Sequence, residues 1–443
     1  MKHILHKERY DYKEIQDLGL ALAFTNSELM SFTCKRKYAY NYVECLDINH
    51  FSQSLFYGTV WHYFCELCLL KIKESDTMIS DDDSISIIEN ELSDFIRSEL
   101  DKFSNLSDKE EILEDTIKNV SLGSIGWLKK WEEEIHPKYK VLDVEKVLIK
   151  PIIDKHGKEL KCEMPIIYEK SKEKLLARLP GIGECFEDLE RFRFNVILSD
   201  YCTSESIERE IQQKEVPIYK VGKIDCILLD RDTNGLYILD HKTSKSPMTY
   251  AKKMHFDLQL QSYCALLDYN IKNGLYSEYE NAFVSGVIWD IVSSKFNKPT
   301  YNNDGSLKKV KRGYITHALA CKILSNPLYE NFKDEYADYL DVLKDRDSSN
   351  YVLLEEFISP KDIARSNAED LVRTVQAIEF KKNCYYLDNL DDVETDLLLV
   401  RQPICQLYNF CEYANLCMQN CLVLDPNMID FDRKHKTYWT VEN

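Results

Sequence analysis

The strongest constraint on the fold is a pair of apolar runs joined by a short polar turn. The runs are VPIYKVGKIDCILLD (216–230) and LYILDHKT (236–243), and both are rich in the β-branched, aromatic and aliphatic residues that favour strands. The Asn-Gly step at 234–235, between them, is typical of a tight hairpin turn. The two runs are therefore predicted to be antiparallel neighbours in one sheet.

Charged side chains interrupt both runs at places where a purely structural strand would be apolar. Asp225 lies in the first run, and Asp240 and Lys242 lie in the second with the two-residue period that puts both on one face, while His241 points to the other. Two carboxylates can hold a divalent cation, and a nearby ammonium can orient or deprotonate a water or stabilise charge on a phosphate. The alternative for an isolated Asp-x-Lys is a cross-strand ion pair.

Two predicted helices carry further polar residues of interest. The segment 56–74 contains Gly58 and His62 in a Gly-x-x-x-His step, and a neutral imidazole is a common metal ligand. Its expected core residues are Val60, Phe64, Leu67 and Leu70. In a helix predicted over 249–272, Gln259 and Tyr263 share one face. Taken singly, each of these residues is also ordinary in a structural helix.

The remaining pattern indicates an α/β protein. Other predicted elements are a helix over 27–44 capped by Ser27, a charged helical segment over 76–135, strand-like runs in 139–215, a strand over 282–292, a turn at 301–314, and a mainly helical 315–382 with a strand at 351–357.

The formal net charge of −18 implies a surface that repels polyanions, so nucleic-acid binding would need a local basic patch or a bound metal. SLKKVKRGY (306–314) and CKRKYAYNY (34–42) place basic residues beside aromatic ones, which suits a single strand, although a solvated hairpin and a solvated helix face explain them equally well. We find no apolar signal segment at the N-terminus and no membrane-spanning run, and we expect a cytoplasmic protein that does not bind membranes.

Fifteen cysteines in a chain without a secretion signal argue against a disulfide scaffold, and most are expected to be small core residues. The exception is an evenly spaced series near the C-terminus, formed by Cys405, Cys411 and Cys417, with Cys421 close behind. It lacks the paired Cys-x2-Cys steps of zinc sites. Such a series can instead hold an iron–sulfur cluster together with Cys34, and Cys421 could replace Cys405.

The order of these motifs resembles that of the RecB-like branch of the PD-(D/E)xK nuclease superfamily. The motifs are Gly-x-x-x-His at 58–62, Gly-x-x-Asp at 222–225, Asp-x-Lys-Thr at 240–243 and Gln-x-x-x-Tyr at 259–263. The resemblance implies that His62, Asp225 and Asp240 bind Mg2+ or Mn2+, with the backbone carbonyl of His241 as a further ligand. It also implies that Lys242 is a catalytic base or water-positioning group, and that Gln259 and Tyr263 line the site.

The cysteines extend the resemblance to the CRISPR-adaptation-type and AddB-type nucleases of this branch. These proteins carry one N-terminal cysteine and three near the C-terminus, which bind a 4Fe-4S cluster. Cys34, Cys405, Cys411 and Cys417 are the implied ligands here. Because the cluster would tie distant parts of the chain together, loss of a ligand should destabilise the fold more than it alters the chemistry.

The resemblance implies an α/β, restriction-endonuclease-like core, with a small mixed sheet flanked by helices, large helical insertions and a C-terminal iron–sulfur segment. The predicted division is an N-terminal helical part (1–75), an insertion that is helical and then strand-rich (76–215), the nuclease core (216–295), a helical lobe with a basic hairpin (296–400) and the cysteine-rich segment (401–443).

The implied activity is that of a metal-dependent DNA exonuclease acting on single strands or DNA ends in recombination, repair or replication, similar to phage-encoded nucleases. The chain contains no phosphate-binding loop of a helicase, so a helicase or recombination partner would be a separate protein. Two alternatives are a non-cleaving iron–sulfur protein that binds DNA ends and a nuclease that acts on RNA.

Overall fold

The computed structural model forms two compact units. Phe51–Lys146 and Lys223–Ile363 make up the first, called the sheet unit, and the second, called the terminal unit, consists of Met1–His50, Val147–Gly222 and Ala364–Asn443. Within them the structure describes residues 21–38, 41–42, 46–48, 51–103, 106–169, 209–252, 257–294, 302–304, 321, 325, 334, 351–386 and 431–433.

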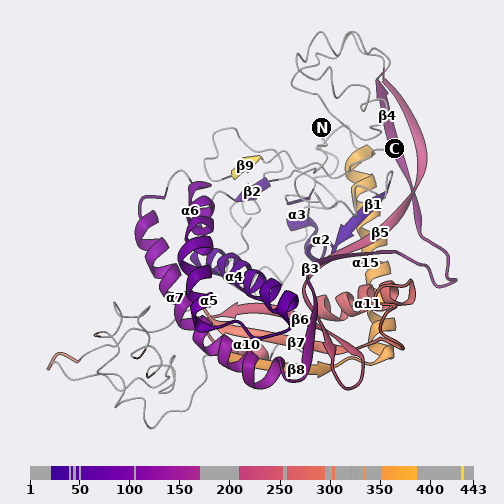
Figure 1. Ribbon diagram of the computed structural model, residues 1–443. Coiled ribbons are helices and arrows are strands. Elements are labelled where there is room, and N and C mark those ends of the chain that lie inside the picture. The colour runs from indigo at the N-terminus through magenta and orange to yellow at the C-terminus, as the bar shows by residue number, and fades with distance from the viewer. Residues whose placement is uncertain are drawn as a thin grey trace. The chain divides into compact units, whose positions relative to one another are not determined.

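The sheet unit contains a mixed sheet and most of the described helices (Figure 1). Its helical elements are α4 (Gln53–Ser75), α5 (Asp81–Ser86), the π-helical η2 (Ile87–Leu92), α6 (Ser93–Asp101), α7 (Lys109–Lys130), the π-helical η3 (Trp131–Ile135), α10 (Pro247–Ala251) and α11 (Leu258–Lys272). Its strands are β6 (Gly235–Ser244), β7 (Phe283–Ser293), β8 (Tyr351–Phe357) and parts of β3 (Tyr139–Pro151) and β5 (Arg209–Asp230).

The predicted hairpin is the centre of this sheet. β5 and β6 pair antiparallel from Cys226↔Leu239 to Leu229↔Leu236. The turn is closed by the Asp230 carboxylate, which accepts hydrogen bonds from the N–H groups of Asp232 and Thr233, at 3.0 and 2.8 Å. β6 then pairs parallel with β7, and β7 pairs antiparallel with β8, so the sheet is mixed.

Helix α4 lies in the core because apolar residues occupy most of its circumference. Its buried residues are Phe56, Tyr57, Val60, Trp61, Phe64, Cys65, Cys68, Leu69 and Ile72. They pack with Cys226 and Leu239 of the hairpin and with Ile288 of β7. The helix ends at Asp76, which adopts a left-handed conformation with φ of 51°. The prediction that Leu70 belongs to the core is wrong, since it is 39% exposed.

The opposite face of the sheet is covered by α10 and α11, which pack on β6 and β7. Because side chains alternate along a strand, Trp289 of β7 points away from its neighbour Ile288 and meets Tyr250 of α10, with ring centroids 5.7 Å apart. The hairpin is therefore buried on both sides, which explains why its strands are almost continuously apolar.

The terminal unit has its own strand pairs. Its elements are β1 (Leu22–Thr25), α2 (Asn26–Ser31), α3 (Lys35–Tyr38), β2 (Leu46–Ile48), β4 (Lys161–Glu169), β9 (Phe431–Arg433), and parts of β3, β5 and α15 (Pro360–Tyr386). β1 pairs parallel and β4 antiparallel with β5, while β2 and β9 form a separate antiparallel pair. Lys220 and Asp370 form a buried ion pair, and burial lowers the pKa of Lys220 although the carboxylate opposes this.

Two predicted helices are each divided into two. The helix expected over 27–44 is interrupted at Phe32, because the Ser31 and Thr33 hydroxyls donate to backbone carbonyls one turn earlier and compete with the helical pattern. The helix expected over 249–272 becomes α10 and α11, and Asp257 begins α11 by accepting from the Gln259 N–H at 2.7 Å.

The helices within 76–135 and the strands at 282–292 and 351–357 agree with the predictions, whereas the short strands β1, β2 and β9 were not predicted. The buried Cys65, Cys68, Cys162, Cys226 and Cys264 confirm that many cysteines are core residues. No helix in the ranges that the structure describes has the length and apolar character that a membrane crossing requires.

Substitution of Gly123 tests the packing of α7 against α4. A Cβ atom at this position would lie 2.8 Å from the Trp61 ring and 3.2 Å from Val292. We expect Gly123→Ala to lower the free energy of unfolding by about 1–3 kcal/mol, because overpacking outweighs the better helix propensity of alanine. Urea denaturation measures this change. Glu114→Ala, at an exposed position of α7, should change stability by less than about 0.5 kcal/mol, and an unchanged Gly123→Ala protein would contradict the packing.

Candidate functional site

The two acidic residues of the hairpin meet just beyond its last paired residues. The β5–β6 ladder ends at Cys226↔Leu239, and Asp225 and Asp240 are the next residue on each strand. The Asp225 Oδ2 atom accepts a hydrogen bond of 2.9 Å from the backbone N–H of His241. The strand end thus presents two carboxylates side by side, as the sequence predicts.

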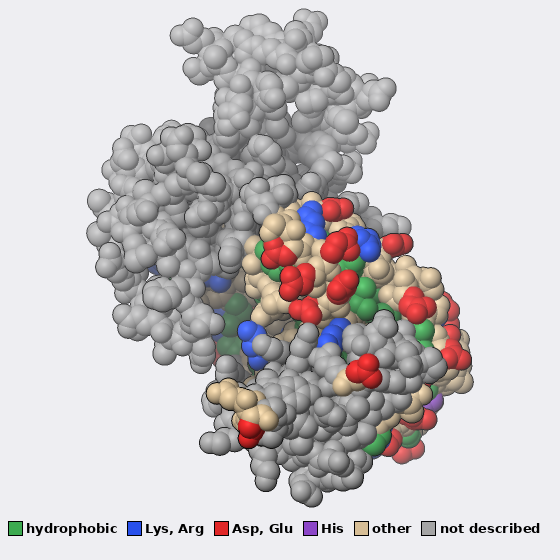
Figure 2. Space-filling model, turned by 90° about the vertical axis from the view of Figure 1, so that its left-hand side faces the viewer, with side chains coloured by type: hydrophobic (Ala, Val, Ile, Leu, Met, Phe, Trp, Pro, Cys, Tyr) green, Lys and Arg blue, Asp and Glu red, His purple; other side chains and the backbone are tan. Residues whose placement is uncertain are grey.

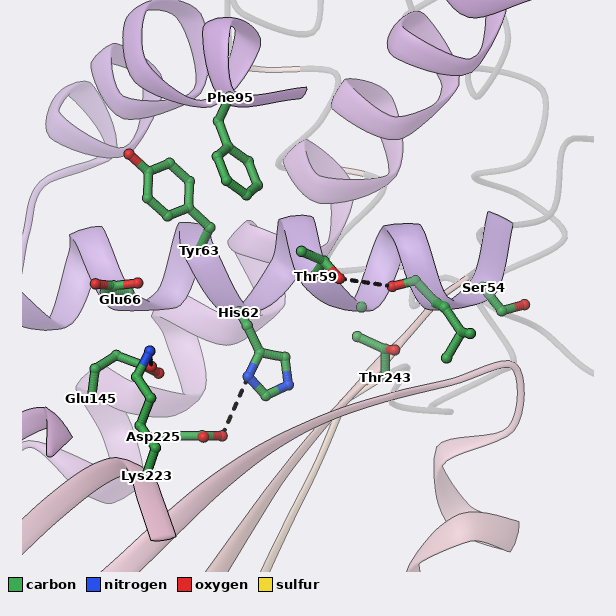
Figure 3. Close-up of a pocket in the computed structure, with 12 residues that line it drawn as sticks. Ser54, Thr59, His62, Tyr63, Glu66, Phe95, Glu145, Lys223, Asp225 and Thr243 are labelled. Carbon is green, nitrogen blue, oxygen red and sulfur yellow. Dashed lines mark hydrogen bonds and ion pairs between the residues drawn. The ribbon is translucent and has the colours of Figure 1, made fainter. Parts of the chain in front are cut away.

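Helix α4 adds His62 to this group. Gly58 allows the helix to approach β6 closely, since a Cβ there would lie 3.3 Å from the Thr243 hydroxyl oxygen. One turn further, His62 points toward β5 where its pairing with β6 ends, and His62 Nδ1 lies 3.4 Å from Asp225 Oδ2 (Figure 3). The spacing of the Gly-x-x-x-His step therefore has a geometric explanation. The glycine lets α4 come close to β6, and the histidine one turn later is then within reach of Asp225.

Lys242 lies on the same face as Asp240, as the two-residue period predicts. Its Nζ is 2.6 Å from Asp240 Oδ2. This is a short contact between an ammonium and a buried carboxylate oxygen. On α11, the Gln259 side-chain amide donates to the Tyr263 hydroxyl at 2.9 Å, which confirms that these two residues share one face.

An open pocket of about 660 Å³ lies beside His62 and Asp225. It is lined by Ser54, Leu55, Gly58, Thr59, His62, Tyr63, Glu66, Phe95, Glu145, Lys223, Asp225 and Thr243 (Figure 3). Lys223 precedes Asp225 by two residues on β5, and it forms an ion pair with Glu145. Glu145 lies within β3 but has a φ of 53°, in the left-handed region. The pocket gives a ligand access to the imidazole and to the first carboxylate.

Burial and mutual repulsion alter the acidity of the site. Burial, followed by the nearby Asp240 charge, raises the pKa of Asp225 to about 6. Burial, followed by the positive charges of His241 and Lys242, lowers the pKa of His62 to about 4. His62 is therefore neutral at pH 7, which is the form of imidazole that binds metals.

Lys242 is held in its charged form. Burial lowers its pKa, but the Asp240 and Asp225 carboxylates outweigh this and the pKa lies above its ordinary value. An ammonium that keeps its proton at neutral pH can donate hydrogen bonds and stabilise negative charge, but it is a poor proton acceptor. The two roles expected for Lys242, catalytic base and water-positioning group, stay predictions.

Tyr263 is electrostatically linked to the same group. Burial raises its pKa to about 12; the hydrogen bond from Gln259 acts in the opposite direction, and the Asp240 carboxylate adds to the increase. Tyr263 therefore remains a neutral hydroxyl at physiological pH.

Asp290 of β7 is a buried polar residue that the sequence interpretation missed. Its Oδ2 atom accepts from His241 Nδ1 at 2.8 Å and from the indole N–H groups of Trp127 and Trp131 at 2.7 and 3.3 Å. The sequence interpretation gave His241 a role only through its backbone carbonyl. In the structure its imidazole is part of a buried hydrogen-bond network. The signal was present in VIWDIV (287–292), where an acid interrupts an apolar strand just as Asp225 and Asp240 do.

The donor set suits a hard divalent cation. Asp225 and Asp240 supply the oxygens of two largely buried carboxylates, and His62 supplies a neutral imidazole. In the described ranges, however, no three or more His, Cys, Asp or Glu side chains are grouped so that they could hold a metal ion. The chemistry of the residues fits the cation, and their assignment as its ligands remains a prediction.

The predicted cluster ligands are only partly within the described residues. Cys405, Cys411, Cys417 and the spare Cys421 lie outside them, as does the basic segment 306–314. Cys34 is half-buried in the turn between α2 and α3, where its N–H donates to the Ser31 carbonyl at 3.1 Å.

The prediction that the aromatic residues of the segment 34–42 stack on a single strand of nucleic acid is wrong for two of them. Tyr38 and Tyr42 are buried, with 0% and 2% exposed, and their rings stack on each other with centroids 5.2 Å apart. The Tyr38 hydroxyl donates to the Glu28 carboxylate at 2.9 Å. These two rings are core residues of the terminal unit and are not available to stack on nucleic-acid bases.

The described surface over α5, α6 and α7 is strongly acidic (Figure 2). Its exposed acidic residues include Asp81, Asp82, Glu89, Glu91, Asp94, Asp101, Glu110, Glu111 and Glu114. A polyanionic ligand would be repelled by this side of the sheet unit.

The raised pKa of Asp225 gives a testable dependence of stability on pH. Because its folded-state pKa is above the ordinary 3.8, ionisation of this group destabilises the fold, progressively from about pH 4 to about pH 6. Without divalent cations, Asp225→Asn should therefore be about as stable as wild type near pH 4 and more stable by roughly 2–3 kcal/mol above pH 6.

Urea denaturation in EDTA at a series of pH values measures this difference. Asp232→Asn, in the exposed hairpin turn, is the control for loss of a carboxylate elsewhere. A stability difference that stays constant between pH 4 and 7 would show that Asp225 is not buried beside Asp240.

Comparison with known families accounts for this arrangement. No curated protein matches the sequence. A family profile described as the PD-(D/E)XK nuclease superfamily matches residues 24–418, most of the chain. The mixed sheet and its flanking helices fit the restriction-endonuclease-like fold of that superfamily. The chain belongs to the PD-(D/E)XK nuclease superfamily.

Proposed function

We propose that the protein is a metal-dependent DNA nuclease, an exonuclease of the RecB-like branch that acts on single strands or DNA ends. One observation supports this above the others. In a chain of a nuclease superfamily, Asp225, Asp240 and Lys242 converge at a strand end with His62 beside an open pocket. Such a group of acids and an ammonium would otherwise cost stability without any return in packing.

The reaction is hydrolysis of a phosphodiester. A water oxygen forms a bond to phosphorus, the bond from phosphorus to one ester oxygen breaks, the water gives up a proton to the solvent, and the departing oxygen is protonated. The Lys242 ammonium, held protonated by Asp240, donates to the attacking water or to a non-bridging phosphate oxygen. The negative charge that develops on the phosphate thus meets a fixed positive charge.

Nucleases of this superfamily usually use Mg2+ or Mn2+. Asp225, Asp240 and His62, with the carbonyl of His241, would hold the cation here, and it would offset the charge on the phosphate and the departing oxygen. The repulsion that raises the pKa of Asp225 would be relieved by that cation. Lys242, on the same face of β6 as Asp240, would orient the reactants together with Gln259 and Tyr263 of α11.

Preference for single strands or ends follows from the resemblance to RecB-like nucleases, and the acidic surface over α5–α7 is consistent with it. That surface would disfavour a long duplex lying across the sheet unit. Helicase or recombination proteins on separate chains would present such ends. The proposal also includes that the protein is cytoplasmic, that a phage encodes it, and that it acts in recombination or repair.

The intact Asp225, Asp240 and Lys242 argue against a protein that binds DNA ends without cleaving them.

A 4Fe-4S cluster held by Cys34, Cys405, Cys411 and Cys417 is a separate part of the proposal. It is supported by the density of cysteines near the C-terminus and by the resemblance to cluster-containing nucleases. Its role would be structural, as in other sites where ligand binding is coupled to folding.

Replacement of the charged residues should separate cleavage from binding. We expect Asp240→Asn and Lys242→Met to lower Mn2+-dependent cleavage of end-labelled single-stranded DNA at least ~100-fold, because each loses charge that acts on the reacting phosphate. DNA binding measured in Ca2+ or without metal should change only a few-fold. Lys245→Met, which removes an exposed lysine three residues further along the chain, should retain activity.

Substrate choice decides between the remaining alternatives. Linear and circular single strands, duplex DNA and RNA are compared under the same conditions with Mg2+ and with Mn2+. Degradation of linear but not circular strands supports an exonuclease, and degradation of RNA alone favours the RNA alternative. Wild-type protein that binds DNA ends without cutting any substrate would overturn the nuclease proposal.

Protein purified without oxygen should be brown and contain iron and sulfide. Cys34→Ser should lose the iron and lower the melting temperature, since the proposed cluster contributes to folding. Cys321→Ser, which changes an exposed cysteine, is the matched control and should keep the iron. Colourless wild-type protein with stoichiometric zinc would show that the cysteines bind zinc instead.

A further inference from the structure

Asp290 is a buried carboxylate for which hydrolysis as described above has no use. It is 0% exposed in the centre of β7, and a carboxylate removed from water needs strong compensating hydrogen bonds. Three donors act on one oxygen, Oδ2: His241 Nδ1 at 2.8 Å, Trp127 Nε1 at 2.7 Å and Trp131 Nε1 at 3.3 Å. An ionised carboxylate can only accept, so His241 donates through Nδ1.

Strand pairing explains why these groups meet. In the parallel β6–β7 ladder, His241 is the Cα partner of Asp290, which places both side chains on the same face of the sheet. Trp127 in α7 and Trp131 in η3 are four residues apart and so lie on one face of the helix above. Three elements therefore converge on a single oxygen atom.

The backbone of His241 faces the other way, into the candidate active site. Its N–H donates to Asp225 Oδ2 at 2.9 Å, and its sequence neighbours are Asp240 and Lys242. The His241 ring also meets the His62 ring edge to face, with centroids 5.8 Å apart. Fixing the imidazole of His241 therefore limits rotation of the backbone that holds Asp225 and limits the space open to His62.

We infer that Asp290 is a positioning residue for the metal site: through the His241 imidazole it fixes the 240–242 backbone, and with it the geometry of Asp225, Asp240 and His62. The inference rests on the proposed function. The competing explanation is that Asp290 serves only to join α7 and η3 to the sheet through the two indoles. The two explanations differ in whether the effect of Asp290 passes through His241 or through Trp127 and Trp131.

A double-mutant cycle between Asp290→Asn and His241→Phe tests the inference. We measure Mn2+ affinity by electron paramagnetic resonance of free Mn2+, with Mn2+ alone as the ligand, and kcat and KM on single-stranded DNA. Loss of a residue that orients metal ligands typically costs 10- to 100-fold in metal affinity or activity. We expect each variant to lose ~10- to 100-fold in Mn2+ affinity and in kcat, with KM nearly unchanged, and the double mutant to lose no more than the stronger single mutant.

Two further variants separate positioning from stability. Ile288→Val removes a buried methylene two residues away on the same face of β7 and leaves both partners of the His241–Asp290 hydrogen bond in place. It should destabilise the protein but leave Mn2+ affinity unchanged. His241→Asn keeps an N–H donor near the position of Nδ1 and should retain more Mn2+ affinity than His241→Phe, a comparison that stands even if Asp290→Asn does not fold.

Several results would overturn the positioning role while leaving the nuclease proposal intact. They are wild-type Mn2+ affinity and kcat in Asp290→Asn, additive losses in the double mutant, equal affinities in His241→Asn and His241→Phe, or a loss of Mn2+ affinity in Ile288→Val. A wild-type protein that neither binds Mn2+ nor cleaves DNA would instead overturn the proposed function itself.

Discussion

The central physical constraint in this protein is the repulsion between two largely buried carboxylates. Asp225 and Asp240 follow the last paired residues of the β5–β6 hairpin, in a place that water reaches poorly. Their proximity is tolerable because other groups partly offset it: a backbone N–H on Asp225 and the Lys242 ammonium on Asp240. A divalent cation would complete that compensation, which gives the arrangement a chemical purpose.

The remainder of the sheet unit serves to hold this strand end in place. α4 approaches β6 at Gly58 and so delivers His62, while α7 and η3 deliver the two indoles that fix Asp290. On the opposite face, α11 places the Gln259–Tyr263 pair. Strand β6 therefore contributes side chains on both of its faces. Asp240 and Lys242 belong to the candidate site on one face, and His241 belongs to the buried network with Asp290 on the other.

The parts of the fold and site that local patterns specify could be predicted from the sequence. The hairpin, α4, β7 and β8 follow from strand and helix periodicities, and the pairing of Asp240 with Lys242 follows from the alternation of side chains along a strand. His62 was identified by its motif, although the reason for the glycine four residues earlier, close approach to Thr243, needed the structure.

What could not be predicted depends on long-range contacts or on competition within a turn. The partnership of Asp290 with His241 requires the parallel register of β6 and β7, which no local pattern encodes. Tyr38 and Tyr42 were indistinguishable from exposed aromatics until their stacking in the core was seen. The break after α2 results from the Ser31 and Thr33 hydroxyls, whose bonds to the backbone override helical periodicity.

Glu145, which lines the pocket, has a backbone conformation that residues other than glycine rarely adopt. A non-glycine residue in the left-handed region costs on the order of 1–3 kcal/mol, and Glu145 adopts this conformation within β3, where its side chain pairs with Lys223 beside the candidate site. A glycine at this position would relieve the backbone and lose the ion pair. The wall of the pocket therefore combines an unfavourable backbone conformation with an ion pair, and the net effect of Glu145→Gly on stability depends on which of the two is larger.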